Sequence, residues 1–314
     1  MTVKPASAHD VRPVRAGSVQ AWAVAVRPRS LLVAISPVLV GGTLGFARQG
    51  AIDLLATLLV LGAALLMQVI TNMQNDVGYT VRGGERSGTR TGLPRATANG
   101  WLSVHHVRAG IVLAALVATA LGLALVAYRG WPVLAIGVAS LLAALAYMGG
   151  PRPIAYTPFG ELTVFVFFGP VAVIGSDWLL SGGVGPWTVP AAVAIGSLAA
   201  AALALNNHRD RVHDEEAGRR TFAVCIGARA SAALYGLLLL APFVLWMAVA
   251  LVAARPALLL PWLLGPAAWR LWRDFRRCPP GLAFNPLLYR SFRMVGTFAV
   301  LLAAGVLLAR WPAG

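Results

Sequence analysis

Residues 71–95 read TNMQNDVGYTVRGGERSGTRTGLPR, and they lead from an apolar run into a polar, basic, glycine-rich loop. The apolar run before them is long enough to cross a bilayer as a helix, which takes about 20 residues. Asn72, Asn75, Asp76 and Tyr79 follow one another at helical spacing, so they share one face if the helix continues. The stretch therefore predicts a membrane helix that carries a polar face into a basic loop.

A second stretch repeats this arrangement after another apolar run, because residues 206–220 read NNHRDRVHDEEAGRR. Asn206, Asp210 and Asp214 follow at i, i+4 and i+8, which places them on one helical face. Each stretch combines carboxylates with amides and leads into arginines. Carboxylate oxygens bind divalent cations, and arginines bind phosphate oxygens in pairs. Two such faces brought together predict a site for a metal-bound diphosphate.

The composition identifies the class of protein. Hydrophobic residues make up 58% of the 314-residue chain and charged residues 12%, and the mean hydropathy is +0.73. A soluble domain carries about 25% charged residues, so we expect an all-α polytopic membrane protein with about nine transmembrane helices. The predicted spans are residues 30–47, 52–74, 104–127, 131–149, 160–181, 187–207, 230–253, 256–271 and 288–309. Two cysteines, Cys225 and Cys278, offer neither a disulfide framework nor a metal-ligand pattern.

The basic residues predict how these spans are oriented. Apart from Arg48, Arg129, Arg255 and Arg310, every lysine and arginine falls on the N-terminal side of the membrane under this assignment. Basic residues gather in cytoplasmic loops, so we expect the N-terminus in the cytoplasm and the C-terminus outside a bacterial-type inner (plasma) membrane. This topology also accounts for the net charge of +15, and no nucleic-acid partner is expected. Residues 1–29 are predicted to be a basic cytoplasmic tail, and residues 30–314 a single transmembrane domain.

Acidic residues are scarce, at 11, and several of them lie in the two polar stretches. A carboxylate at the end of a membrane helix is costly to desolvate and is a functional candidate by default. We therefore take Asp76, Asp210 and Asp214 as candidate metal-binding and catalytic residues. Arginines that stabilise charge on a leaving group are expected beside them, and the candidates are Arg82, Arg90, Arg95, Arg219 and Arg220.

A third segment, YMGGPRPIAY at residues 147–156, is a short turn between two spans on the same predicted side. Glycine and proline fix the path of such a turn, so Tyr147, Arg152 and Tyr156 could close the polar site from a third direction. The following helix contains FVFFGPVAVIG, whose phenylalanines could line a channel for an isoprenoid tail. Packing or lipid-facing aromatics explain the same residues equally well.

Together the three segments resemble the UbiA superfamily of intramembrane aromatic prenyltransferases. The resemblance is carried by Asn72-x-x-Asn75-Asp76, by residues 90–95, by YMGGPRPIAY, by GELTVFVFFGPVAVIG and by NNHRDRVHDEEAGRRTFAVCIG. Within the superfamily the chain looks most like the branch that prenylates 1,4-dihydroxy-2-naphthoate in menaquinone synthesis. The implied fold is nine helices around a central cavity, with two Asp-rich cytoplasmic loops above it.

The resemblance also implies a site and a reaction. Asp76, Asp210 and Asp214 would bind Mg²⁺ and a polyprenyl diphosphate, supported by Asn72, Asn75 and Asn206, while Arg152, Arg219 and Arg220 would contact phosphate or the acceptor carboxylate. The allylic diphosphate would ionise, and an electron-rich aromatic ring would attack it. In the naphthoate branch the ring carboxylate is then lost as CO₂.

Tyr79 is the main departure from the family pattern. The first motif of the family usually has a second Asp at this position, three residues after the first, and a further Asp is replaced here by Glu85. Glu85 still offers a carboxylate for the metal, whereas Tyr79 removes one expected ligand. We expect Tyr79 to face the site and to narrow the pocket for the acceptor.

Other functions remain open on the sequence alone. A prenyltransferase for another aromatic acceptor, or a UbiA-type terpene cyclase, would use the same fold, and Tyr79 favours such a change. A transporter or lipid-binding membrane protein belongs to a different class. Transporters place charged coupling residues near the bilayer midplane, whereas the charges here lie at the predicted cytoplasmic helix ends.

Overall fold

The computed structural model describes residues 14–84, 91–279 and 281–309, and these residues contain helices and no strand. The all-α class is therefore confirmed. The elements are α1 (Val19–Val26), η1 (Pro28–Ser30), α2 (Leu31–Gln49), α3 (Leu54–Val81), α4 (Val104–Arg129), α5 (Trp131–Ala146), η2 (Ile154–Tyr156), α6 (Gly160–Val166), η3 (Phe167–Ile174), α7 (Gly175–Ser181), α8 (Thr188–Glu216), α9 (Phe222–Val252), η4 (Pro256–Leu264), α10 (Gly265–Arg277) and α11 (Phe284–Ala309).

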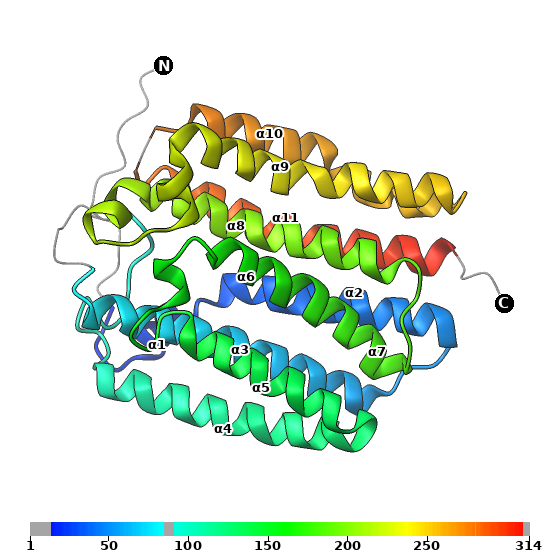
Figure 1. The fold of residues 1–314 in the computed structure, drawn as a ribbon, viewed down its shortest axis with the longest axis horizontal. Coiled ribbons are helices and arrows are strands. Elements are labelled where there is room, and N and C mark those ends of the chain that lie inside the picture. The colour runs from blue at the N-terminus through cyan, green and yellow to red at the C-terminus, as the bar shows by residue number, and fades with distance from the viewer. Residues whose placement is uncertain (1–13, 85–90, 280, 310–314) are drawn as a thin grey trace.

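The long helices lie side by side with their axes roughly aligned (Figure 1). Helices α3 and α8 both end on the left of this view, so the two polar stretches lie at one end of the bundle. The turn between α5 and α6 lies at the same end. The bundle thus gathers all three segments that the sequence singled out, and we refer to this end as the motif end.

Seven of the described helical segments are long and apolar enough to cross a membrane. They begin at Val19, Leu54, Val104, Gly160, Thr188, Phe222 and Phe284, and helix α5 is apolar but shorter. The molecule is a polytopic membrane protein, but the predicted count of nine is not confirmed. The predicted span at 256–271 is divided between the 3₁₀ segment η4 and the basic helix α10. Pro256, Pro261 and Pro266 explain this division, because proline cannot donate the backbone hydrogen bond that a continuous helix needs.

Helix α8 lies at the centre of the bundle and is rich in alanine along its buried length. It crosses the π-helical segment η3 closely, because two glycines meet there. A Cβ on Gly196 would lie 2.7 Å from the carbonyl oxygen of Phe165 and 2.9 Å from the Cα of Gly169. Small residues of this kind let membrane helices approach without a cost in packing. The π-helical segment contains Pro170, which has no backbone N–H and so cannot donate the hydrogen bond of a regular α-helix.

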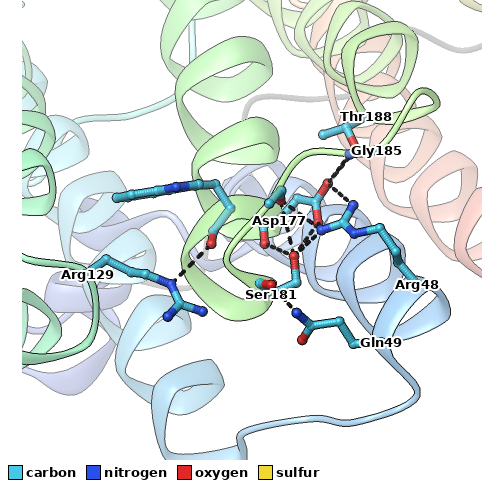
Figure 2. A network of polar contacts seen from close by, with 9 residues as sticks. Arg48, Gln49, Arg129, Asp177, Ser181, Gly185 and Thr188 are labelled. Carbon is cyan, nitrogen blue, oxygen red and sulfur yellow. Dashed lines mark hydrogen bonds and ion pairs between the residues drawn. The ribbon is translucent and has the colours of Figure 1, made fainter.

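The opposite end of the bundle is tied together by the buried carboxylate of Asp177 (Figure 2). Arg48, at the end of α2, donates to Asp177 Oδ1 at 2.9 Å and to Oδ2 at 3.3 Å. The hydroxyl of Thr188 donates to Oδ2 at 2.5 Å, and Ser181 donates to Oδ1 at 3.0 Å. The network therefore joins α2, α7 and the start of α8, far from the motif end.

Candidate active site

A cavity of about 820 Å³ occupies the middle of the bundle. Its walls are mostly apolar, and they include Phe167 and Phe168 of η3 and residues of α2, α3, α5 and α8. Phe165, which the sequence grouped with these two phenylalanines, does not belong to the lining. Seven polar residues of the lining come from the predicted motifs: Asn72, Asn75, Tyr79, Arg95, Tyr147, Asn206 and Arg219. A volume of this size is typical of sites for small molecules and cofactors.

The wall formed by α3 confirms the predicted helical face only in part. The helix continues to Val81, so Asn72, Asn75 and Tyr79 all reach the cavity. Asn72 also holds the joint between α1 and α2, because its Nδ2 donates to the carbonyl of Val26 at 2.7 Å and to Ser30 Oγ at 2.9 Å. Its amide thus ties the N-terminal segment to the wall of the site.

Asp76 lies beside these residues but does not belong to the cavity lining. Its carboxylate is fully buried and accepts hydrogen bonds from the backbone N–H of Ala96 and of Thr97, each at 2.8 Å. The hydroxyl of Thr97 donates to the same carboxylate at 2.6 Å. In this structure Asp76 therefore holds the loop after α3 in place, and that loop positions Arg95.

Tyr79 lies between two arginines at the motif end of the cavity. The guanidinium carbon of Arg95 is 3.7 Å from the centre of the Tyr79 ring, and that of Arg219 is 4.9 Å away. Arg219 also donates a hydrogen bond to the Tyr79 hydroxyl, and Arg95 donates to the carbonyl of Asn75 at 3.0 Å. The tyrosine is 3% exposed and faces the cavity, as the sequence predicted.

Helix α8 supplies the second set of polar residues. Asp210 and Asp214 are buried near its end, and each carboxylate is paired with an arginine. Arg209 donates to both oxygens of Asp210 at 2.7 Å and to Asn206 Oδ1 at 2.7 Å, while Arg219 pairs with Asp214. Asn206 reaches the cavity, and the two carboxylates lie behind the lining.

Burial affects the charge of Arg219 itself. Its guanidinium lies in the loop between α8 and α9 and is 4% exposed. Burial lowers the pKa of Arg219 to about 9, so the group remains protonated at neutral pH. Two further hydrogen bonds to the carbonyl of Ala155, at 2.9 Å and 3.2 Å, fix its orientation.

The third segment reaches the site through one of its three predicted residues. Tyr147 lines the cavity, whereas Arg152 is exposed outside it. Tyr156 lies behind Arg219, whose guanidinium carbon is 5.3 Å from the centre of its ring, and its carbonyl accepts from the backbone N–H of Arg220 at 3.1 Å. The Arg220 side chain is exposed. The structure thus brings Tyr156 and Arg220 to the edge of the site. Glu85 and Arg90 lie outside the described residues.

The cavity lining also contains polar residues that were not predicted from the sequence, and several of them have a charged or amide side chain. Arg27 and Arg29 come from the joint between α1 and α2, Gln68 lies one turn before Asn72, and Asn207 follows Asn206. The i, i+4 spacing of Gln68 and Asn72 was a usable signal. Among the described residues of the lining, the charged side chains are arginines and no Asp, Glu or His is present. The cavity is therefore an attractive environment for an anion.

The donors at the end of α8 fit a hard divalent cation. Asp210, Asp214 and Asn206 supply carboxylate and amide oxygens, and Mg²⁺ takes one or two carboxylates while phosphate oxygens and water complete its shell. In the part of the chain that the structure describes, no group of three or more His, Cys, Asp or Glu forms a complete metal site. A cation would therefore be held jointly by the protein and its substrate.

Comparisons with known proteins agree with this architecture. The 1,4-dihydroxy-2-naphthoate octaprenyltransferase of Escherichia coli is 32% identical over 94% of this chain and 97% of that protein. The enzyme of the same name from Mycobacterium tuberculosis is 36% identical over 76% of this chain and 83% of that protein.

Solved structures share the fold at lower identity. The UbiA homologue from Archaeoglobus fulgidus bound to DMAPP and Mg²⁺ superposes with a TM-score of 0.59 at 17% identity, covering 90% of this chain and 98% of that one. The apo UbiA homologue from Aeropyrum pernix gives 0.62 at 16% identity, covering 88% and 96%. The profile of the UbiA prenyltransferase family matches residues 34–281. That match covers most of the chain and, with the identity to the E. coli protein, it shows that the chain belongs to the UbiA prenyltransferase family.

Proposed function

We propose that this prenyltransferase transfers a polyprenyl group from its diphosphate to 1,4-dihydroxy-2-naphthoate, which would give demethylmenaquinol. The observation that carries the proposal is the cavity, which joins a long apolar body to a cluster of arginines and amides at the motif end. A polyprenyl diphosphate has the same two parts, an apolar tail and an anionic head. The acceptor is supported by the names of the E. coli and M. tuberculosis relatives.

Arg95 and Arg219 are the proposed ligands of the diphosphate. Both are buried, both line the cavity, and both are held by Tyr79. Guanidinium groups bind phosphate oxygens in pairs and stabilise the charge that develops on a leaving diphosphate. Asn75 and Asn206 lie on the same walls and would donate further hydrogen bonds. The apolar wall with Phe167 and Phe168 would hold the prenyl tail and keep water away from its reacting carbon.

Asp210, Asp214 and Asn206 are the proposed protein ligands of Mg²⁺, which the solved relative from Archaeoglobus fulgidus binds together with DMAPP. When bound, the ion neutralises charge on the diphosphate and makes it a better leaving group. Asp210 and Asp214 are paired with arginines in this structure, so cation binding would release Arg209 and Arg219 toward the phosphate oxygens. Glu85 remains a proposed further ligand on the strength of the sequence.

The motif end is proposed to face the cytoplasm of a bacterial-type inner membrane, with the C-terminus on the other side. Most arginines lie at this end of the spans, which follows the rule that basic residues remain on the cytoplasmic side. Residues 30–314 are proposed to form a single domain, with residues 1–29 as a cytoplasmic tail that adds Arg27 and Arg29 to the cavity wall. Part of that tail forms α1, which packs against α3.

An alternative function follows from Tyr79. The bulk of this side chain at the motif end could favour a different aromatic acceptor or, without an acceptor, cyclisation of the prenyl chain. A test that separates these reactions uses purified protein in nanodiscs with farnesyl diphosphate and Mg²⁺, offered dihydroxynaphthoate or 4-hydroxybenzoate in parallel, with products followed by mass spectrometry.

Each result has a distinct meaning. A prenylated and decarboxylated naphthoquinol that disappears with EDTA and in Asp210→Ala supports the proposal. Prenylation of 4-hydroxybenzoate alone would assign a different acceptor. A hydrocarbon formed without any acceptor would assign a cyclase.

A further inference from the structure

A buried carboxylate lies beside the cavity and belongs to neither polar motif. Glu161 is the second residue of α6 and is 7% exposed. Its Oε1 accepts a hydrogen bond from Asn207 Nδ2 at 3.0 Å, and its Oε2 accepts none from the residues that the structure describes. Leaving a buried carboxylate oxygen without a donor costs free energy. No role was predicted for this side chain from the sequence, so its second oxygen requires an explanation.

Two cavity residues connect Glu161 to the site. Asn207 and Tyr147 both line the cavity. Their polar groups converge on Gly160, the residue before Glu161, because a Cβ there would lie 3.7 Å from the Tyr147 hydroxyl and 4.0 Å from Asn207 Nδ2. Burial, together with the nearby charges of Glu161 and Asp214, raises the pKa of Tyr147 above its ordinary value. The Tyr147 hydroxyl therefore keeps its proton at neutral pH and can donate it to a neighbour.

Prenyl transfer to a hydroxylated ring is faster when the ring hydroxyl gives up its proton, because the oxyanion makes the ring carbon more nucleophilic. The wall of the cavity offers no direct acceptor for this proton, since no Asp, Glu or His occurs among the described lining residues. Asp210 and Asp214 are paired with arginines, which weakens them as bases. Glu161 is bonded only through the uncharged amide of Asn207, and the Tyr147 hydroxyl lies close to its neighbour Gly160.

We propose that Glu161 receives the hydroxyl proton of the aromatic acceptor through Tyr147, and this inference rests on the proposed function. In this step the Tyr147 hydroxyl turns toward Glu161 Oε2, which accepts no hydrogen bond in the structure as described. The acceptor proton then passes to the Tyr147 oxygen as the Tyr147 proton passes to Glu161 Oε2. Electrons from the ring oxyanion form the bond between the ring carbon and C1 of the prenyl group, and the C1–O bond breaks with its electron pair leaving on the diphosphate. Loss of CO₂ from the ring returns its electron pair and re-forms the oxyanion, which takes the proton back through Tyr147.

The role assigned to Glu161 is that of a positioning residue, because it acts on the acceptor through Tyr147. The test compares wild type with Glu161→Gln, which preserves the shape of the side chain and its contact with Asn207. Glu215→Gln is the control, because it makes the same chemical change at an exposed position on α8. The measurements are the affinity for farnesyl thiolodiphosphate, kcat for transfer to dihydroxynaphthoate, and the anaerobic absorbance of bound dihydroxynaphthoate, which distinguishes naphthol from naphtholate.

We expect Glu161→Gln to bind the thiolodiphosphate as wild type does and to lose about 100-fold in kcat, which is the usual scale for a missing general base. Its bound acceptor should absorb as the naphthol, whereas wild type and Glu215→Gln should show the naphtholate band. A purely structural role would instead weaken diphosphate binding together with kcat. Should Glu161→Gln fail to fold, Tyr147→Phe interrupts the same proton path and should give the same result.

The outcomes separate this inference from the proposed function. Wild type that transfers no prenyl group to dihydroxynaphthoate overturns the proposed function. Wild type that transfers it, with a Glu161→Gln variant that keeps its kcat and its naphtholate band, overturns the role of Glu161 alone. The absorbance tests the proton transfer even without turnover. The role of Glu161 is also overturned if dihydroxynaphthoate bound to wild type shows only the naphthol band, or if wild type does not bind dihydroxynaphthoate.

Discussion

Arg219 donates a hydrogen bond to the hydroxyl of Tyr79, although 140 positions separate the two residues in the sequence. The same guanidinium pairs with Asp214 and donates to the carbonyl of Ala155. Three parts of the chain therefore meet on one arginine at the motif end of the cavity. The family resemblance led us to expect a carboxylate at position 79. In this structure Tyr79 instead contacts the guanidinium group of Arg219 and helps to hold it in place.

The first prediction concerns this contact. Tyr79→Phe removes the acceptor of a hydrogen bond from a charged donor, which is worth about 1.5–3 kcal/mol. We expect the dissociation constant of farnesyl thiolodiphosphate to rise roughly tenfold or more, since Arg219 loses part of its support. Tyr128→Phe, at the other end of the bundle, is the matched control and should bind as wild type does.

Tyr79→Asp should act differently, because it adds a carboxylate close to Asp214. We expect its diphosphate binding to depend more strongly on Mg²⁺ than that of wild type, measured as the ratio of dissociation constants with EDTA and with Mg²⁺. An unchanged ratio would show that position 79 takes no part in holding the cation.

The second prediction uses the acidity of Arg219. Because its pKa lies at about 9, the guanidinium loses its charge as the pH rises through that value. An uncharged group attracts the diphosphate less, so affinity should fall between pH 8 and pH 10. Arg219→Gln carries no charge at any pH and should show weaker binding with a flat profile over this range. A wild-type profile that is equally flat would assign the diphosphate to other residues.

At the motif end, the sequence correctly predicted which residues share a face where this depends only on their spacing along one helix. Helix α3 continues through Asn75, so Asn72, Asn75 and Tyr79 share a wall of the cavity. Asp76 shows the limit of that reasoning. Its carboxylate is used by the backbone of Ala96 and Thr97, some 20 positions later, and no spacing within the helix indicates such a contact.

Glu161 and Asp177 were also visible in the sequence as acidic residues in apolar surroundings, which is a signal of function or buried pairing. Their partners could not be read from the sequence, because Asn207 and Arg48 come from distant helices. Likewise, the arginines at 27 and 29 were assigned to a cytoplasmic tail. The packing of α1 against α3 and of η1 against α11 brings them to the cavity.

The third prediction concerns the network around Asp177. Asp177→Ala leaves Arg48 without its buried partner, and breaking such a pair costs about 3–5 kcal/mol. We expect a clear fall in the thermal unfolding temperature in nanodiscs, with diphosphate binding preserved at low temperature because the network lies far from the motif end. Asp274→Ala is the control, since its ion pairs with Arg273 and Arg290 are partly exposed and contribute little. Equal effects of the two variants would contradict the structural role of Asp177.

The fourth prediction concerns the length of the prenyl chain. Gly175 lines the cavity at the start of α7, on the side away from the arginines, and a Cβ there would meet no heavy atom within 4 Å. Gly175→Phe therefore places its ring in open cavity rather than in packed protein, and it should block the path of a long tail.

Given equal amounts of geranyl and octaprenyl diphosphate, wild type should prenylate the acceptor from both, as judged by mass spectrometry. Gly175→Phe should keep the geranyl product and lose at least about tenfold in the octaprenyl product, a change of about 1.4 kcal/mol in relative transition-state binding. Gly175→Ala adds only a methyl group to open space and should leave the ratio unchanged. If Gly175→Phe also leaves the ratio of the two products unchanged, the prenyl tail leaves the cavity before it reaches α7. The terminal units of the tail would then lie in the bilayer and not in the far end of the cavity.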